Sequence, residues 1–302
     1  MLPRPTVGDK PLPIAHHPLD DTFFWAGTLA HGTLEQRIEA ARAGGFSYLS
    51  MFPTDYRRAV ERGLSDADIL ALHERAGVRL MTLDPYTRWL PRWTPPAKTP
   101  PERLEWVSFE EDEFFAIVEA LELETITVNE AFGAHYELDE MIEAFAAVCD
   151  RAARSGIRAH LEFTPFSAIP DLATAWQIVT AADRPNGGLA FDTWHYLRGT
   201  RDDALLEEIP GDRIFVVQIN DAAAEPVRSL LNDTLNHRLM PGDGDFDLAG
   251  VLPIVARKAG VGPPGIEVLS QELWKLGPAE IGRRSEEGLR SALALAGPWG
   301  GN

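Results

Sequence analysis

The feature that most constrains the fold of this sequence is an alternation of strand and helix patterns that repeats eight times. Short apolar runs typical of strands alternate with segments whose apolar residues recur every three or four positions, as in amphipathic helices. Several helical segments end in glycine just before the next strand, a common C-terminal signal of a helix. Strands are predicted at residues 22–26, 46–52, 78–84, 124–130, 157–164, 188–194, 213–220 and 264–269.

Eight strand-then-helix units predict a parallel sheet with helices outside, and at 302 residues the natural closure is a (β/α)8 TIM barrel. A doubly wound sheet is the alternative. It usually carries a G-x-G-x-x-G turn after the first strand, whereas residues 25–32 read WAGTLAHG. Residues 1–20 are rich in proline and aperiodic, and they are predicted to form an extended arm before a single barrel domain, residues 21–302.

Charge and cysteine content exclude several classes of protein. The chain has 28 basic and 46 acidic residues, a formal net charge of -18, which repels phosphate backbones and anionic lipid, so no nucleic-acid or membrane role is expected. Cys149 is the only cysteine, so neither an intramolecular disulfide nor a cysteine-based zinc site can form. With no signal-like segment and no long apolar run, a cytoplasmic location is expected.

Two connections are long for simple turns. Residues 85–107, rich in tryptophan and proline, follow the third strand, and residues 221–245 follow the seventh. Loops after barrel strands lie at the catalytic end, so both are predicted to form pocket walls. The alternative for the first loop is a contact between subunits. We expect a homo-oligomer and leave open a small partner subunit.

Polar residues end four consecutive predicted strands. Glu162, Asp192, Gln218 and Glu267 stand near the ends of strands five to eight. Neighbouring strands are about 4.8 Å apart, so four side chains at equivalent depth could converge on one ion. Three carboxylates and an amide oxygen form a hard ligand set, which favours Mn²⁺, with Mg²⁺ or Co²⁺ as alternatives. The alternative is a solvated or salt-bridged carboxylate cluster.

The segments HLEFTP, FDTWH, VVQIND, RLMPGDGDFD and GIEVLS resemble the xylose-isomerase-like TIM-barrel superfamily. This sugar phosphate isomerase/epimerase family includes inosose and dehydroshikimate dehydratases. The resemblance spans residues 22–295 and implies that the four strand-end residues are metal ligands. It also implies that His195 binds substrate and that Arg238 contacts a substrate oxygen. Gln218 departs from the ketose epimerases, which usually have histidine there, whereas some of the dehydratases use glutamine.

Further candidates surround this set. His160, two residues before the first predicted ligand, should share its face one layer deeper. Some metal-dependent C-glycoside deglycosidases of the superfamily have a histidine near that position; the alternative is a buried histidine bonded to a carboxylate. Trp25 and Trp194 could stack on a sugar ring or pack in the core. Glu130 could support the substrate site or cap the next segment. His73 is expected on a solvated helix surface.

Proton abstraction beside a carbonyl leaves an enolate, whose charge a divalent ion stabilises as a Lewis acid. With Glu162 and Glu267 as bases on opposite sides, the sequence predicts a metal-dependent isomerase or epimerase acting through a metal-stabilised enediolate. If His195 or His160 protonates a leaving β-substituent, the outcome is a lyase, such as a dehydratase or a C-glycoside deglycosidase-like enzyme. A barrel that binds metal or sugar without catalysis is the third hypothesis.

The expected substrate is an unphosphorylated keto-sugar or cyclitol, or, for the lyase, a keto-polyol or 3-keto-glycoside. A phosphorylated sugar would favour a glycine-rich loop with basic residues after strand seven or eight, and neither loop fits. A Schiff-base mechanism needs a lysine on a strand, and Lys10, Lys98, Lys258 and Lys275 all lie outside the predicted strands.

Overall fold

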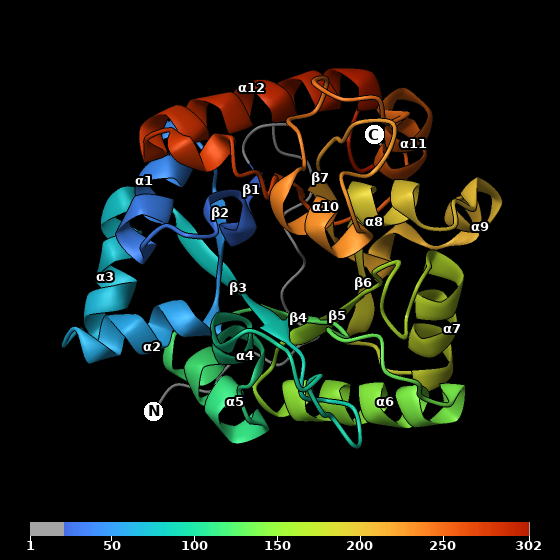
Figure 1. The fold of residues 1–302 in the computed structure, drawn as a ribbon, viewed down its shortest axis with the longest axis horizontal. Coiled ribbons are helices and arrows are strands. Elements are labelled where there is room, and N and C mark those ends of the chain that lie inside the picture. Colours follow the sequence, from blue (N-terminus) through green and yellow to red (C-terminus); the bar gives the residue numbers. More distant parts are fainter. Residues whose placement is uncertain (1–20, 302) are drawn as a thin grey trace.

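A computed structural model describes residues 21–301 and shows eight parallel strands that close into a barrel in sequence order (Figure 1). This confirms the predicted (β/α)8 TIM barrel, while the predicted arm, residues 1–20, lies outside the described residues. Each strand overlaps its predicted range. The strands are β1 (Phe23–Phe24), β2 (Tyr48–Met51), β3 (Arg79–Tyr86), β4 (Thr125–Val128), β5 (Arg158–Glu162), β6 (Gly187–Asp192), β7 (Ile214–Ile219) and β8 (Pro264–Ile266).

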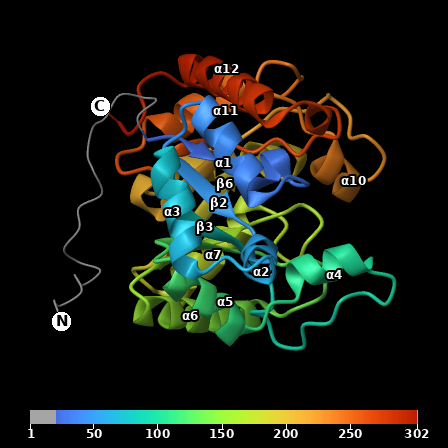
Figure 2. The same ribbon diagram turned by 90° about the vertical axis from the view of Figure 1, so that its left-hand side faces the viewer.

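Helices form a ring around the strands (Figure 1). They are α1 (Leu34–Ala43), α2 (Pro53–Glu61), α3 (Asp66–Ala76), α4 (Pro101–Val107), α5 (Glu111–Ala120), α6 (Leu138–Arg154), α7 (Leu172–Ala182), α8 (Thr193–Arg198), α9 (Asp203–Glu208), α10 (Leu230–Asn236), α11 (Leu248–Ala256) and α12 (Pro278–Ala296). The two long connections contain α4 and α10, which lie at the same end of the barrel (Figure 2). That end is where the strands finish, so both loops border the mouth.

Local signals explain where several helices begin and end. Thr33 and Ser65 each accept a hydrogen bond from the backbone N–H three residues on, within capping boxes that start α1 and α3. Gly77 ends α3 in the left-handed region, with φ of 69°, where glycine carries no steric penalty. The end of α3 at Gly77 leads the chain back into β3.

The apolar core has two parts. The larger part lies between strands and helices, where residues such as Phe114, Phe145 and Leu252 are fully or almost fully buried. A separate cluster fills the barrel interior with side chains from β1, β2, β3, β6 and β7 and from the residue after β1. Its members are Phe23, Trp25, Tyr48, Met81, Ala190 and Val216. Because the interior is packed, the polar strand-end residues are left at the mouth.

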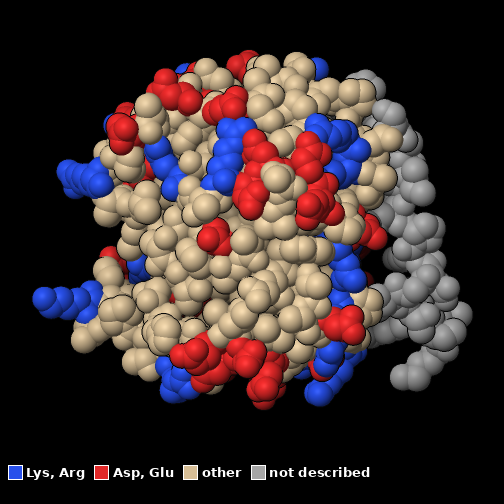
Figure 3. Space-filling model, turned by 90° about the vertical axis from the view of Figure 1, so that its right-hand side faces the viewer, with Lys and Arg blue, Asp and Glu red and all other residues tan. Residues whose placement is uncertain are grey.

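Acidic and basic side chains are interspersed over the face formed by α7, α9 and α11 (Figure 3). Arg201 bridges Asp203 and Asp247 there, at 2.7 and 2.9 Å. Within residues 21–301, no helix has the length and apolar character that membrane crossing requires.

Candidate functional site

The four predicted ligand residues are all buried at the strand ends. Glu162 and Asp192 are the last residues of β5 and β6, Gln218 is in β7, and Glu267 directly follows β8. The register pairs Asp192 with Gln218, whereas Glu162 pairs with Ala190, two residues short of Asp192. The predicted ligand residues therefore do not lie at the same level of the hydrogen-bonded ladder. Barrel strands are tilted and staggered, so residues offset by two in register still meet at the mouth.

Arg238 joins two of these carboxylates. Its Nη1 donates to Asp192 Oδ2 at 2.8 Å and to Glu267 Oε2 at 3.2 Å, and all three side chains are buried. Nη2 lies 3.5 Å from His195 Nε2. The structure thus brings together Arg238, His195, Asp192 and Glu267, whereas the sequence analysis assigned Arg238 to a substrate oxygen and did not predict its bonds to the two acids.

Two asparagines that sequence reasoning missed also donate hydrogen bonds to carboxylates of the site. Asn129 Nδ2 donates to Glu162 Oε2 at 3.0 Å, and Asn220 Nδ2 donates to Asp192 Oδ2 at 3.1 Å. Asn129 follows β4 directly and Asn220 follows β7 directly, so the strand-end rule that found the acids could have found these amides.

The mouth holds more acidic than basic side chains. Asp84 of β3, which the sequence analysis did not single out, is a fourth buried carboxylate beside Glu162, Asp192 and Glu267. Burial and the Glu162 charge raise the pKa of Asp84 to about 8. Burial and the Asp192 charge raise the pKa of Glu162 to about 7, and burial holds the pKa of Glu267 well above its usual value.

Asp192 behaves differently from the other three acids. Burial acts to raise its pKa, but the charge of Arg238 and the backbone N–H of His195, which donates at 3.0 Å, hold the pKa below its usual value. The Arg238 guanidinium therefore keeps the Asp192 carboxylate ionised. The remaining acids favour protonation unless another cation shares the site.

The donors fit a hard divalent cation in chemistry. Both polar side-chain atoms of Gln218 are buried without a hydrogen bond of normal geometry, an uncommon state for an amide inside a protein, although the amide lies close enough to Glu162 to lower the pKa of that carboxyl. An oxygen-seeking ion among Glu162, Asp192, Gln218 and Glu267 would satisfy it. As the side chains stand, residues 21–301 contain no group of three or more His, Cys, Asp or Glu that could hold an ion. The Arg238 guanidinium bonds to both Asp192 and Glu267 instead.

His195 is a buried imidazole within this site. Burial lowers its pKa to about 4, although the Asp192 charge acts in the opposite direction. The ring is therefore neutral at pH 7. Its Nδ1 has no hydrogen-bond partner. Such a group can accept or return a proton.

His160 lies one layer below Glu162, as the strand period predicted. Its partner is a threonine and not a carboxylate: Nε2 lies 3.3 Å from Thr125 Oγ1, and the ring meets Trp25 edge-on at 6.3 Å between centroids. Burial lowers its pKa to about 3. Trp25 is fully buried and stacks on Phe23 at 4.5 Å, so it has the core-packing role that was the alternative to substrate stacking.

For Trp194 and Glu130 the structure selects one of the two alternatives, and for His73 it corrects the expectation. Trp194 is fully buried and donates from Nε1 to Asp233 Oδ2 at 2.9 Å, with its ring 5.7 Å from the Arg238 guanidinium carbon. Glu130 accepts from three loop N–H groups at 2.7–2.9 Å and so has the capping role. The expectation for His73 is wrong: it is 3% exposed, because it lies on the inward face of α3.

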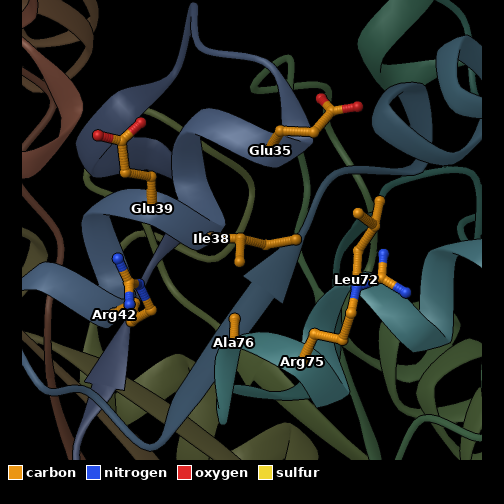
Figure 4. A pocket seen from close by; sticks show the side chains of 7 residues that line it. All are labelled: Glu35, Ile38, Glu39, Arg42, Leu72, Arg75 and Ala76. Carbon is orange, nitrogen blue, oxygen red and sulfur yellow. The ribbon is translucent and has the colours of Figure 1, made fainter.

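A shallow groove of about 320 Å³ lies on the outer wall between α1 and α3 (Figure 4). Ile38, Leu72 and Ala76 supply its apolar lining, and its charged lining residues are Glu35, Glu39, Arg42 and Arg75. None of the predicted site residues lines it. The chemistry-bearing residues are those at the mouth.

Comparison with known proteins agrees with this fold. The family model for the xylose isomerase-like TIM barrel matches residues 38–294. The 3-dehydroshikimate dehydratase of Pseudomonas aeruginosa is 28% identical over 267 residues, 87% of this chain and 40% of that protein. The inosose isomerase of Bacillus velezensis is 27% identical over 147 residues, 48% of this chain and 51% of that protein. The chain thus spans about two fifths and about half of these relatives.

A solved structure shows the same fold. The crystal structure of the IOLI protein with a bound zinc atom superposes with a TM-score of 0.76 at 17% identity, over 91% of this chain and 98% of that one. Since the family model covers most of the barrel, including β2 to β8, this chain belongs to the xylose isomerase-like TIM barrel family.

Proposed function

We propose that this chain is an enzyme that removes a proton beside the carbonyl of an unphosphorylated keto-polyol or cyclic polyol. One observation carries the proposal: the mouth brings together the buried carboxylate of Glu162, whose pKa burial raises, and the buried imidazole of His195, whose Nδ1 has no hydrogen-bond partner. A general base works best when its pKa lies near the working pH. Glu162 is therefore the base, and His195 holds or returns a proton.

We further propose that Glu162, Asp192, Gln218 and Glu267 hold one divalent cation, with Mn²⁺ as the first candidate. The uncommitted amide of Gln218 and the excess of buried carboxylates support this assignment. The related IOLI structure carries zinc. When bound, such an ion supplies Lewis-acid polarisation of the substrate carbonyl. Arg238, which already contacts Asp192 and Glu267, orients the substrate oxygen.

Dehydration is the outcome we favour. The match to the 3-dehydroshikimate dehydratase covers 87% of this chain, against 48% for the inosose isomerase. Gln218 also stands where the resemblance places glutamine in some dehydratases. In this reaction Glu162 takes the proton beside the carbonyl, and the electron pair of that C–H bond forms the new double bond as the hydroxyl group departs. The neutral His195 ring relays the same proton from Glu162 to the departing hydroxyl group, which leaves as water.

Isomerisation or epimerisation is the second candidate, and Glu267 is the observation that favours it. A proton returned on the opposite face needs a second acid, and Glu267 is a buried carboxylate whose pKa is raised well above its usual value. In the structure this carboxylate is paired with Arg238 at 3.2 Å, so it serves as that acid only after the pair opens.

The test incubates the purified chain with Mn²⁺ in D₂O, once with 3-dehydroshikimate and once with an inosose. Dehydration gives an unsaturated product, and isomerisation gives a deuterated isomer. Chelation should abolish either activity, and Mn²⁺ should restore it. Turnover of neither compound, with or without Mn²⁺, would count against the proposal, and turnover that survives complete metal removal would contradict the metal assignment.

A further inference from the structure

We infer that Asp233 and Thr234, adjacent residues of α10, are positioning residues that hold Arg238 and His195 in the geometry the reaction needs. The inference rests on the proposed function. Both residues are almost fully buried, with 1% and 2% of their surface exposed. They belong to a short helix in the long loop after β7, at the mouth.

Thr234 fixes the orientation of the Arg238 guanidinium. Its Oγ1 accepts from Nη2 at 2.8 Å and from Nε at 3.3 Å, and its carbonyl oxygen accepts from Nε at 3.1 Å. The opposite edge, Nη1, is then aimed at Asp192 and Glu267. Because a guanidinium is planar, holding one edge sets the direction of the other.

Asp233 ties α10 to α8, the helix that carries His195. Its Oδ2 accepts from Trp194 Nε1 at 2.9 Å and from Arg198 Nε at 3.2 Å, and its Oδ1 accepts from the Val227 N–H at 2.7 Å. The indole of Trp194 in turn meets the His195 ring edge-on at 5.3 Å. The Asp233 carboxylate therefore fixes the indole of Trp194, which lies against both Arg238 and His195.

α10 does not need these side chains to begin. Ser229 caps the helix, since its Oγ accepts from the Asn232 N–H at 3.2 Å. Asp233 and Thr234 instead direct their polar atoms toward α8 and Arg238. Partners that orient groups in a site in this way commonly change activity about tenfold to a hundredfold when they are removed.

The experiment compares Thr234→Val, which keeps the shape and removes the hydroxyl, with Thr234→Ser, which keeps the hydroxyl. We expect Thr234→Val to lower kcat about tenfold or more with little change in KM, and Thr234→Ser to stay near wild type. The second readout is the NMR signal of the Arg238 Nε–H, assigned by its loss in Arg238→Lys. Its exchange with water should be slow in wild type and Thr234→Ser, and faster in Thr234→Val.

Wild-type kcat and wild-type exchange in Thr234→Val would overturn the inference, as would equal losses in Thr234→Ser. If Thr234→Val does not fold, Trp194→Phe gives the second test, because it keeps a ring and removes the donor to Asp233. Faster Arg238 exchange there supports the inference, and unchanged exchange contradicts it. If the wild type turns over no substrate, the proposed function fails while the Arg238 signal still decides the positioning role.

Discussion

Glu162 combines burial and a raised pKa with two neighbouring amides, Asn129, which donates at 3.0 Å, and Gln218. Glu162→Gln keeps the shape of this side chain and its ability to accept that bond, but it cannot take a proton. We expect a loss of activity of at least about a hundredfold. Glu267→Gln should show a comparable loss. Glu137→Gln, at a position 77% exposed, is the matched control. Full turnover in both site variants would show that the base is misassigned.

His73 tests the cost of burying a neutral imidazole outside the site. Burial lowers its pKa to about 4 in the folded chain, from 6.5. Above pH 6.5 both states are neutral there. As the pH falls from 6.5 toward 4, His73 becomes protonated in the unfolded state but stays neutral in the folded state, so the free energy of unfolding falls. Between pH 7 and pH 4.5 we expect the free energy of unfolding of His73→Leu to fall by about 2 kcal/mol less than that of wild type. Urea unfolding at the two pH values measures this difference. The exposed His135→Gln should behave like wild type; an identical acid loss in His73→Leu would refute this.

Residue positions were predictable where the strand pattern alone decides them. The acids at strand ends followed from the strand pattern, because strand ends meet at one mouth. The same rule covers Asp84, Asn129 and Asn220, which were overlooked. The burial of His73 had a signal too, since Ile69 lies four residues before it on the same face of α3. Hydrogen-bond partners, such as Thr125 for His160, depend on register and could not be read from the sequence.

At the scale of elements, α1 and α12 pack so closely that glycines are required where they meet. A Cβ on Gly282 would overlap the carbonyl oxygen of Ala40, and one on Gly44 would overlap that of Gly282. Glycine to alanine in a helix usually gains about 1 kcal/mol. Overpacking typically costs about 1–3 kcal/mol, and here backbone would have to move.

We therefore expect Gly282→Ala to lower the free energy of unfolding, while Gly288→Ala on the same helix is neutral or stabilising. A Cβ on Gly288 would lie 3.1 Å from Pro241 Cδ, a contact that a small shift relieves. Denaturant unfolding of the two variants tests this. Equal stability of both would mean that the crossing of α1 and α12 tolerates a methyl group.

Element positions were largely predictable, because strand and helix periods differ and each strand overlaps its expected range. Strand lengths were not. β1 has two paired residues and β8 has three, since the residues after them leave the ladder. At Thr28 the chain turns to hydrogen-bond with the end of β8, through Ile266 O at 3.1 Å. α4 and α10 were not predicted within their loops because short helices leave a weak periodic signal.

At the scale of the whole molecule, an acidic chain collects four of its carboxylates in one buried mouth and sets one guanidinium among them. The excess of acidic side chains there was predicted, because both the charge of a residue and its position in a strand can be read from the sequence. Sequence reasoning did not predict that Arg238 would bond to two of the acids.

A cation that binds the folded state alone stabilises it by mass action, by about 2.7 kcal/mol at a hundred times its Kd. Adding Mn²⁺ to metal-free protein should therefore raise Tm, and chelation should reverse the rise.

Gln218→Met separates this stabilisation from the effect of simply changing the site. Its amide is buried and neither polar atom makes a hydrogen bond of normal geometry, and leaving such a group unsatisfied costs about 1–3 kcal/mol. Methionine has a similar volume and no amide, so the metal-free variant should be at least as stable as metal-free wild type. The variant should also lose most of the Mn²⁺-dependent rise in Tm, because an oxygen donor is gone. Thermal unfolding of both proteins across a Mn²⁺ titration measures the two effects together. A variant that keeps the full rise would place the cation away from Gln218, and a metal-free variant much less stable than wild type would mean that the amide has a structural partner.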